Sequence, residues 1–176
     1  VLAADMSLYS SDYRSGERTF QLLVQAAGRA GRGSAPGEVV IQTYDPEHYS
    51  IKTAAKQDYQ AFYREELEFR DRMGYPPVEN LMAVLAACED EALLEKACKY
   101  LKEYILRIKG QAQLDVIGPA SPGVDKIKDI YRRVIYVKAP EYRTLVVLKD
   151  RMEQYIEINS GFQKMRIQFD FNPMNL

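Results

Sequence analysis

Two arginines and a glutamine stand at positions that would share one face of a helix. Gln25, Arg29 and Arg32 are separated by four and then three residues, the spacing of neighbours on a helical surface. Guanidinium groups carry permanent charge and a fixed fork of donors, so two of them beside an amide can receive a phosphate group. Gly28 and Gly31 remove side chains beside the arginines and would allow close approach of the backbone. The pattern therefore predicts phosphate recognition.

A simpler interpretation of the same residues is structural. The segment from Glu17 to Ala30 is expected to be a helix, with Gly31 and Gly33 at its end. Arginines near the C-terminal end of a helix interact favourably with its dipole. For the short pattern GRxGR taken alone, both interpretations stay open.

The wider sequence around these residues resembles a known family. The pattern QxxGRxGR, preceded by ERTFQLL, is similar to motif VI of superfamily 2 helicases. The run from Asp5 to Ile51 resembles the end of the second motor lobe in the primosomal protein N′ (PriA) family. Further similar segments follow in the family's order: DYQAFYREELEFRDRMGYPP, VIGPASP and the terminal FDFNPMNL. The resemblance covers nearly the whole chain.

This resemblance implies a 3′-to-5′ DNA-unwinding ATPase that recognises stalled replication forks and initiates primosome assembly in bacterial replication restart. It implies that Arg32 is the arginine finger, which in phosphoryl transfer stabilises the charge on the γ-phosphate oxygens. Arg29 would contact the γ-phosphate or couple it to the lobes, and Gln25 would position the phosphate or the attacking water. Gly28 and Gly31 would lie beside the nucleotide.

The chain lacks the residues that would cradle that nucleotide. It contains neither the Walker A pattern GxxxxGK[ST] nor a DExH-type box. By the resemblance, ATP and Mg²⁺ would be bound mainly by a first lobe of the parent protein, and zinc by a separate cysteine-rich module. We therefore expect no ATP hydrolysis and no cofactor in this chain alone. It opens on the apolar VLAAD rather than on Met, which is typical of an excised piece.

The hydrophobic pattern predicts an α/β part followed by an α+β part. Residues 1–57 would be the C-terminal part of a RecA-like helicase lobe 2, with strands at 1–4 and 39–44. Residues 58–78 would form a connecting helix and a Tyr-Pro-Pro corner. Residues 79–176 would form a small β-α-β-β-α-β sandwich. Its elements are expected at 81–88, 91–109, 114–117, 127–139, a helix from 140, and 165–171.

Basic and aromatic residues interleave in one segment of this last domain. In the PriA family, which this chain resembles, the C-terminal domain is similar to a small-subunit ribosomal protein fold and binds branched DNA. The candidate DNA contacts are Lys126, Lys128, Tyr131, Arg132 and Arg133, because cations neutralise phosphates and aromatic rings stack on unpaired bases. Since side chains alternate along a strand, Arg132 and Arg133 would face opposite sides. The alternative is a solvated strand whose charges protect a sheet edge.

Composition limits the other functions. With 24 basic and 25 acidic residues, bulk charge predicts no nucleic-acid binding, so any such surface must be local. Two cysteines and one histidine make a metal site improbable, and buried thiols in a reducing compartment fit better. No apolar run is long enough to span a membrane. We expect a cytoplasmic, nucleoid-associated protein.

The remaining expectations concern partners and single residues. The resemblance implies contacts with single-strand-binding protein and other primosome proteins, and the truncated lobe could self-associate. The alternative class is a non-enzymatic nucleic-acid or protein-interaction module. His48 is expected as an exposed helix-start residue, and the tyrosines of 58–73 as core. The family commonly ends in DVDP, whereas this chain has Asp170-Phe171-Asn172-Pro173, which leaves any role of the second acidic position in doubt.

Overall fold

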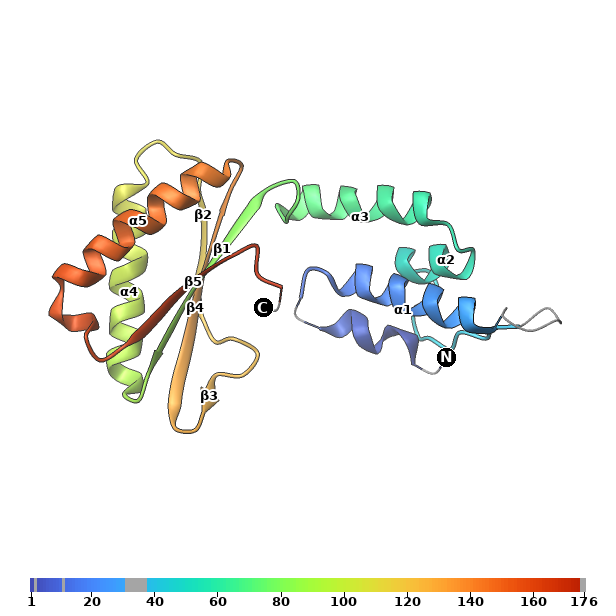
Figure 1. The fold of residues 1–176 in the computed structure, drawn as a ribbon, viewed down its shortest axis with the longest axis horizontal. Helices are drawn as coiled ribbons and strands as arrows, with labels where there is room; N and C mark the ends of the chain where they lie inside the picture. The colour runs from blue at the N-terminus through green and yellow to red at the C-terminus, as the bar shows by residue number, and fades with distance from the viewer. Residues whose placement is uncertain (2, 11, 31–37, 175–176) are drawn as a thin grey trace. The chain divides into compact units, whose positions relative to one another are not determined.

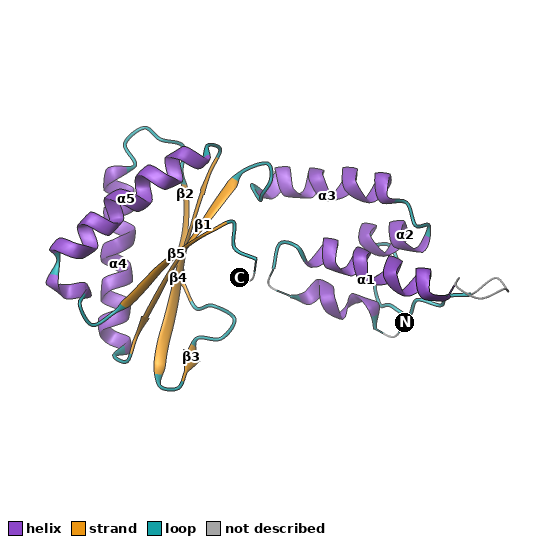
Figure 2. Cartoon of the chain, in the orientation of Figure 1, coloured by secondary structure: helices purple, strands orange, loops and turns teal. Residues whose placement is uncertain are grey.

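The computed structural model describes residues 1, 3–10, 12–30 and 38–174. The chain divides into two compact units, Val1–Met73 and Gly74–Leu176. In the described residues the first unit is helical, whereas the second contains a sheet and two long helices (Figures 1 and 2). Each unit is described by itself below.

The first unit is held together by a small aromatic and aliphatic core. Its elements are the 3₁₀ helix η1 (Ala4–Tyr9) and the helices α1 (Ser15–Ala30), α2 (Tyr49–Ala55) and α3 (Tyr59–Met73). Phe20 of α1 stacks on Phe62 of α3, with ring centroids 4.2 Å apart. Leu23 and Ile51 are buried in the same cluster. The predicted helices at 17–30 and 58–73 are therefore present.

The prediction of two strands in this unit, at 1–4 and 39–44, is wrong for the described residues. Residues 38–44 form no regular strand, and their pairing with the chain start is limited to a few hydrogen bonds, such as Gln42 N–H to Val1 O and Ala4 N–H to Gln42 O, both 2.9 Å. Ala3 has a left-handed φ of 48°, and η1 begins at the next residue. The described residues of these two segments therefore form no regular strand pairing.

The second unit is one antiparallel sheet covered on one face by two helices. The sheet order is β2-β4-β1-β5, and a short strand β3 pairs with β4. The elements are β1 (Asn80–Cys88), α4 (Glu91–Ile108), β2 (Asp115–Ala120), β3 (Lys126–Ile127), β4 (Ile130–Ala139), α5 (Tyr142–Ile158), η2 (Ser160–Phe162) and β5 (Arg166–Phe171). The expected β-α-β-β-α-β order is present, with α4 and α5 on the same side of the sheet (Figure 1). This is the split βαβ arrangement.

Two expected boundaries in this unit differ from the structure. β2 continues through Gly118-Pro119, where a stop was expected, by means of a register irregularity between Ile117 and Ala120. The single strand expected at 127–139 is divided into β3 and β4 by a tight turn at Lys128 and Asp129. Both differences arise from local backbone geometry that hydrophobic patterning does not report.

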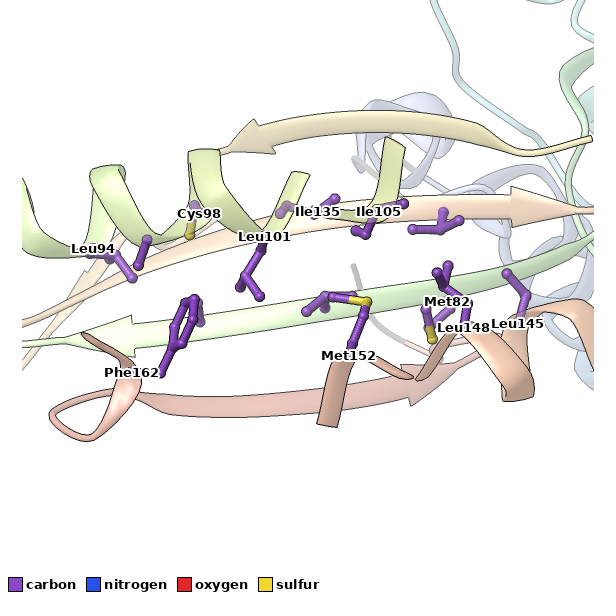
Figure 3. Packing of buried hydrophobic residues seen from close by; sticks show 14 of the residues in the cluster. Met82, Leu94, Cys98, Leu101, Ile105, Ile135, Leu145, Leu148, Met152 and Phe162 are labelled. Atoms are coloured by element: carbon purple, nitrogen blue, oxygen red, sulfur yellow. The ribbon is translucent and has the colours of Figure 1, made fainter. Parts of the chain in front are cut away.

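The core lies between the sheet and its two helices. Leu101 and Ile105 of α4, Leu145 and Met152 of α5, and Met82 of β1 are fully buried there (Figure 3). Cys88 and Cys98 are buried free thiols. Burial raises the pKa of Cys98 to about 11, so this thiol stays protonated at neutral pH.

Replacing Leu101 by Ala tests this core. The substitution removes a side chain with 0% exposure, and we expect a loss of about 2–5 kcal/mol in the free energy of unfolding, because a cavity forms among well-packed neighbours. Leu106→Ala on the same helix is the control, since Leu106 is 44% exposed. Urea unfolding followed by circular dichroism provides the measurement. Equal losses in the two variants would contradict the assigned packing.

Candidate nucleic-acid interface

The described part of the predicted phosphate-binding pattern lies at the end of α1. Gln25 and Arg29 are exposed and one helical turn apart, so they project from the same side of the helix. Gly28 is also exposed, and no other part of the described structure comes within 4 Å of the place a Cβ would occupy. Gly31 and Arg32 lie outside the described residues, so the geometry of the complete pattern stays a prediction.

The first turn of α1 is anchored by a buried arginine of α3. Arg70 donates from Nη2 to Glu17 Oε2 and from Nε to Glu66 Oε1, both at 2.7 Å. Arg70 and Glu66 are only 8% and 6% exposed. Burial alone would lower the pKa of Arg70, but the hydrogen bonds to Glu66 and Glu17 raise it above its ordinary value. The guanidinium is therefore charged at every accessible pH.

The same carboxylate also binds α2. Tyr49 donates its hydroxyl to Glu66 Oε2 at 2.7 Å, and burial together with that carboxylate raises the pKa of Tyr49 well above its usual range. Gly16 permits this approach, because a Cβ there would stand 2.7 Å from Tyr49 Oη and 2.8 Å from Glu66 Oε2. Arg70, Glu66, Glu17 and Tyr49 thus form one cluster, called the Arg70 cluster below, that connects α1, α2 and α3 beside the aromatic core.

In the second unit, a tight hairpin joins β3 to β4. Lys128 and Asp129 at its turn have φ values of 49° and 63°, the left-handed pair typical of a type I′ turn. Ile127 and Ile130 are directly opposed across the hairpin, with 46% and 40% of their surface exposed. Lys126 is paired with Asp129 at 3.0 Å. The hairpin lies at the start of β4 (Figure 1).

Strand alternation separates the two adjacent arginines. Arg133 lies on the helix-covered face, where it forms ion pairs with Glu91 and Glu95 of α4 and is 9% exposed. Tyr131 lies on the same face, half-buried, with Lys126 Nζ 4.6 Å from the centre of its ring. Arg132 lies on the other face and donates to Val124 O at 3.3 Å. Of the predicted basic pair, only Arg132 is directed away from the helices.

A hollow of about 850 Å³ adjoins the hairpin at this end of the sheet. Four cationic side chains line it, two beside the hairpin and two at the start of β5: Lys128, Arg132, Lys164 and Arg166. Within the described part of the chain, none of these four is in an ion pair. Sequence reasoning missed Lys164 and Arg166, because they are about thirty residues beyond the predicted basic segment.

Other residues singled out in the sequence occupy structural positions. His48 caps the start of α2 with Nδ1 accepting from Ser50 N–H at 3.2 Å. It is half-buried rather than exposed, and burial lowers its pKa. Tyr59 and Tyr63 of α3 are 62% and 52% exposed, so the expectation that they belong to the core is wrong. Tyr59 lies at the margin of the core, with its ring centroid 6.2 Å from that of Phe20.

Asn172, which stands where the family commonly has a second acidic residue, makes hydrogen bonds to the start of β1. Asn172 Oδ1 accepts the N–H of Leu81 at 2.9 Å, and its own N–H donates to Leu81 O at 2.6 Å. An aspartate carboxylate could accept the first bond equally well. Asn172 therefore ties the end of β5 to the start of β1. Among the described residues, no cluster of metal-binding side chains and no helix able to cross a membrane are found.

Comparison with known proteins agrees with the resemblance seen in the sequence. Residues 71–174 match the family model of the primosomal protein N C-terminal domain. The chain belongs to this family. It is 35% identical to the replication restart protein PriA of Bacillus subtilis over 98% of its own length, and 38% identical to that of Thermotoga maritima over 80%. The PriA of Synechocystis is 35% identical over the full chain.

These PriA relatives are much longer proteins. The chain spans 21% of the Bacillus subtilis protein, 20% of the Synechocystis protein and 18% of the Thermotoga maritima protein. The similarity to PriA extends across both units, because the Synechocystis match covers the whole chain.

The Arg70 cluster yields a stability prediction. Arg70→Met should destabilise the first unit by about 3–5 kcal/mol, because Glu17 and Glu66 lose their shared cation while Glu66 stays buried. Arg72→Met, two residues along the helix, should have little effect, since its ion pair with Glu68 spans 3.9 Å at the surface. Hydrogen exchange of the α1 and α3 amides reports on this unit alone. Equal exchange in both variants would exclude the anchoring role.

Proposed function

We propose that this chain is part of an ATP-dependent 3′-to-5′ DNA helicase that recognises stalled replication forks and initiates primosome assembly. The observation that carries the proposal is the family match over residues 71–174, with PriA relatives similar over both units. In this proposal, residues 1–57 belong to a RecA-like second lobe. ATP and Mg²⁺ bind mainly to a first lobe, and zinc to a cysteine-rich module, elsewhere in the parent protein.

The α1 helix would deliver the motor chemistry. Gln25 and Arg29 share one exposed side of α1, and Gly28 leaves space beside them, which supports the approach of a nucleotide held by another part of the protein. Arg32 would follow as the arginine finger, acting on the charge that develops at the γ-phosphate. Without that nucleotide the arginines have no charge to stabilise, so the chain alone would bind DNA without hydrolysing ATP.

The second unit would supply the DNA contacts. Lys128 and Arg132 support this role, because both line the hollow at the hairpin and neither is in an ion pair within the described ranges. Arg133 is excluded from the proposed interface by its two ion pairs on the helix side. Lys126 and Tyr131 contact each other and would brace the hairpin. Single-strand-binding protein and other primosome proteins are proposed partners, in a cytoplasmic, nucleoid-associated setting.

The arginine-finger assignment is testable in the full-length protein. Arg32→Ala should lower DNA-stimulated ATP hydrolysis by about 10³-fold or more, the usual contribution of such a residue. Lys52→Ala is a suitable control, because Lys52 is an exposed residue of α2 whose ion pair in the described structure is with Glu47. Phosphate release with and without DNA is the readout. An Arg32→Ala protein with normal DNA-stimulated turnover would refute the assignment.

The DNA contacts can be tested on this chain directly. Lys128→Gln combined with Arg132→Gln should reduce the salt dependence of binding to forked DNA by about 1.4 to 1.8 in the slope of log K against log salt, because each phosphate contact contributes about 0.7 on a single strand and about 0.9 on a duplex. Lys99→Gln with Arg107→Gln removes the same charge from exposed positions on α4. Fluorescence anisotropy at several salt concentrations measures both pairs. Identical slopes would place the contacts elsewhere.

A further inference from the structure

The hollow beside the β3–β4 hairpin joins cations from two distant parts of the chain. Ala87 of β1 is paired with Arg132 of β4 on one side and with Arg166 of β5 on the other. Directly opposed residues of an antiparallel sheet share a face, so both arginines project from the face opposite the helices. The small side chain of Ala87 lies between them. Lys128 lies on the same side of the hollow as Arg132, and Lys164 on the same side as Arg166, so these pairs form two rims.

Exposed apolar side chains line the same hollow. Ile127 and Ile130 form a cross-strand pair at the hairpin, and both line the space that the cations surround. Cations contact phosphates, but isoleucine gains little from a sugar–phosphate backbone in water. In nucleic-acid complexes, isoleucine and similar residues contact bases that have been unstacked. A ligand that uses both features must offer phosphates and accessible base faces together.

The charge of the hollow favours an anionic ligand although the whole chain has a net charge of −1. Two carboxylates also line it, from Glu89 and Asp90. Asp90 is already engaged as the N-cap of α4, where its Oδ1 accepts the N–H of Leu93 at 2.9 Å. A carboxylate at a helix N-terminus is partly compensated by the helix dipole. Four cations against two carboxylates leave the site positive.

We infer that this hollow binds a segment of single-stranded DNA. Its phosphates lie between the rim of Lys128 and Arg132 and the rim of Lys164 and Arg166, and a base rests against the Ile127–Ile130 pair. The inference rests on the proposed DNA-binding function and adds two things to it. It assigns β5 and the residue two positions before it to the interface, and it specifies unpaired rather than duplex DNA as the ligand.

The cationic half of the inference is tested on the intact chain with a labelled oligothymidylate. Lys164→Gln with Arg166→Gln should lower the salt slope by about 1.4, since each single-strand phosphate contact contributes about 0.7, and weaken binding about 25-fold at 0.1 M salt. The control pair Lys99→Gln with Arg107→Gln should change neither quantity appreciably. All four residues are exposed, so thermal melting should show that both variants remain folded.

The apolar half is tested by Ile127→Ser with Ile130→Ser. This variant should bind the oligothymidylate about fivefold more weakly, the lower end of what stacking one base on a side chain contributes, with an unchanged salt slope. Binding to a blunt duplex should stay the same, because paired bases do not reach the isoleucines. Equal weakening toward both ligands would overturn the claim of base contact.

Three results separate the possible failures. If the unaltered chain binds neither oligothymidylate nor forked DNA, the proposed function and this inference fall together. If it binds oligothymidylate but the Lys164/Arg166 variant behaves like the control pair, DNA binding stands and the hollow is the wrong site. If a labelled polyglutamate peptide binds, loses affinity in that variant and outcompetes oligothymidylate, the occupant is an acidic protein segment and the inference is overturned.

Discussion

The register of β1 between β4 and β5 determines what each face of the sheet can do. Every second residue of β1 points into the helix-covered core, and the intervening residues face the other way. Because β4 and β5 are paired with β1 residue for residue, their own side chains are sorted into the same two sets. A shift by one residue would move Arg133 into the hollow and Arg132 into the core. The apolar core and the cationic site are therefore consequences of one pairing.

The first unit depends on a different kind of constraint, a buried charge shared between helices. Its apolar core is small, and the Arg70 cluster connects all three helices beside it. A buried arginine with two carboxylates is costly to break, yet it contributes less net stability than apolar packing of the same volume would. Its hydrogen bonds join Glu17 of α1 to α3, beside the packing of Phe20 and Leu23 in the same helix. That helix also carries Gln25 and Arg29.

Much of the second unit could be predicted from the sequence, because its elements follow strong periodic patterns. The apolar run of β1 and the helical spacing in α4 and α5 each reflect burial on the face that the structure buries. The first unit was harder to predict from the sequence. The segment 39–44 has the residue types of a strand, but a strand needs a neighbouring strand to pair with, and the chain start beside it enters η1 at Ala4. Composition reports a preference for extended backbone, not the presence of a partner.

The candidate site also divides into residues that the sequence could predict and residues that only the fold brings together. Lys128 and Arg132 were predicted because they are close in sequence to other basic and aromatic residues. Lys164 and Arg166 were not, because only the pairing of β5 with β1 brings them to that end of the sheet. The ion pairs of Arg133 could not be predicted either, since its partners Glu91 and Glu95 lie about forty residues earlier in the chain. Alternation predicted that one of the two arginines must face the core side, but not which one.

Four cations also limit what the hollow can do alone. If all four contact phosphates of a single strand, log K falls with log salt with a slope of about −2.8, so affinity drops roughly 50-fold between 0.05 and 0.2 M salt. Acting alone, such a site loses most of its affinity over this range of salt, whereas another part of the protein could bind the same DNA. When it does, the second contact becomes intramolecular, and a weak site gains from a high effective concentration. Under the proposed function, a salt-sensitive hollow suits movement along DNA, because each contact can be released without losing the whole complex.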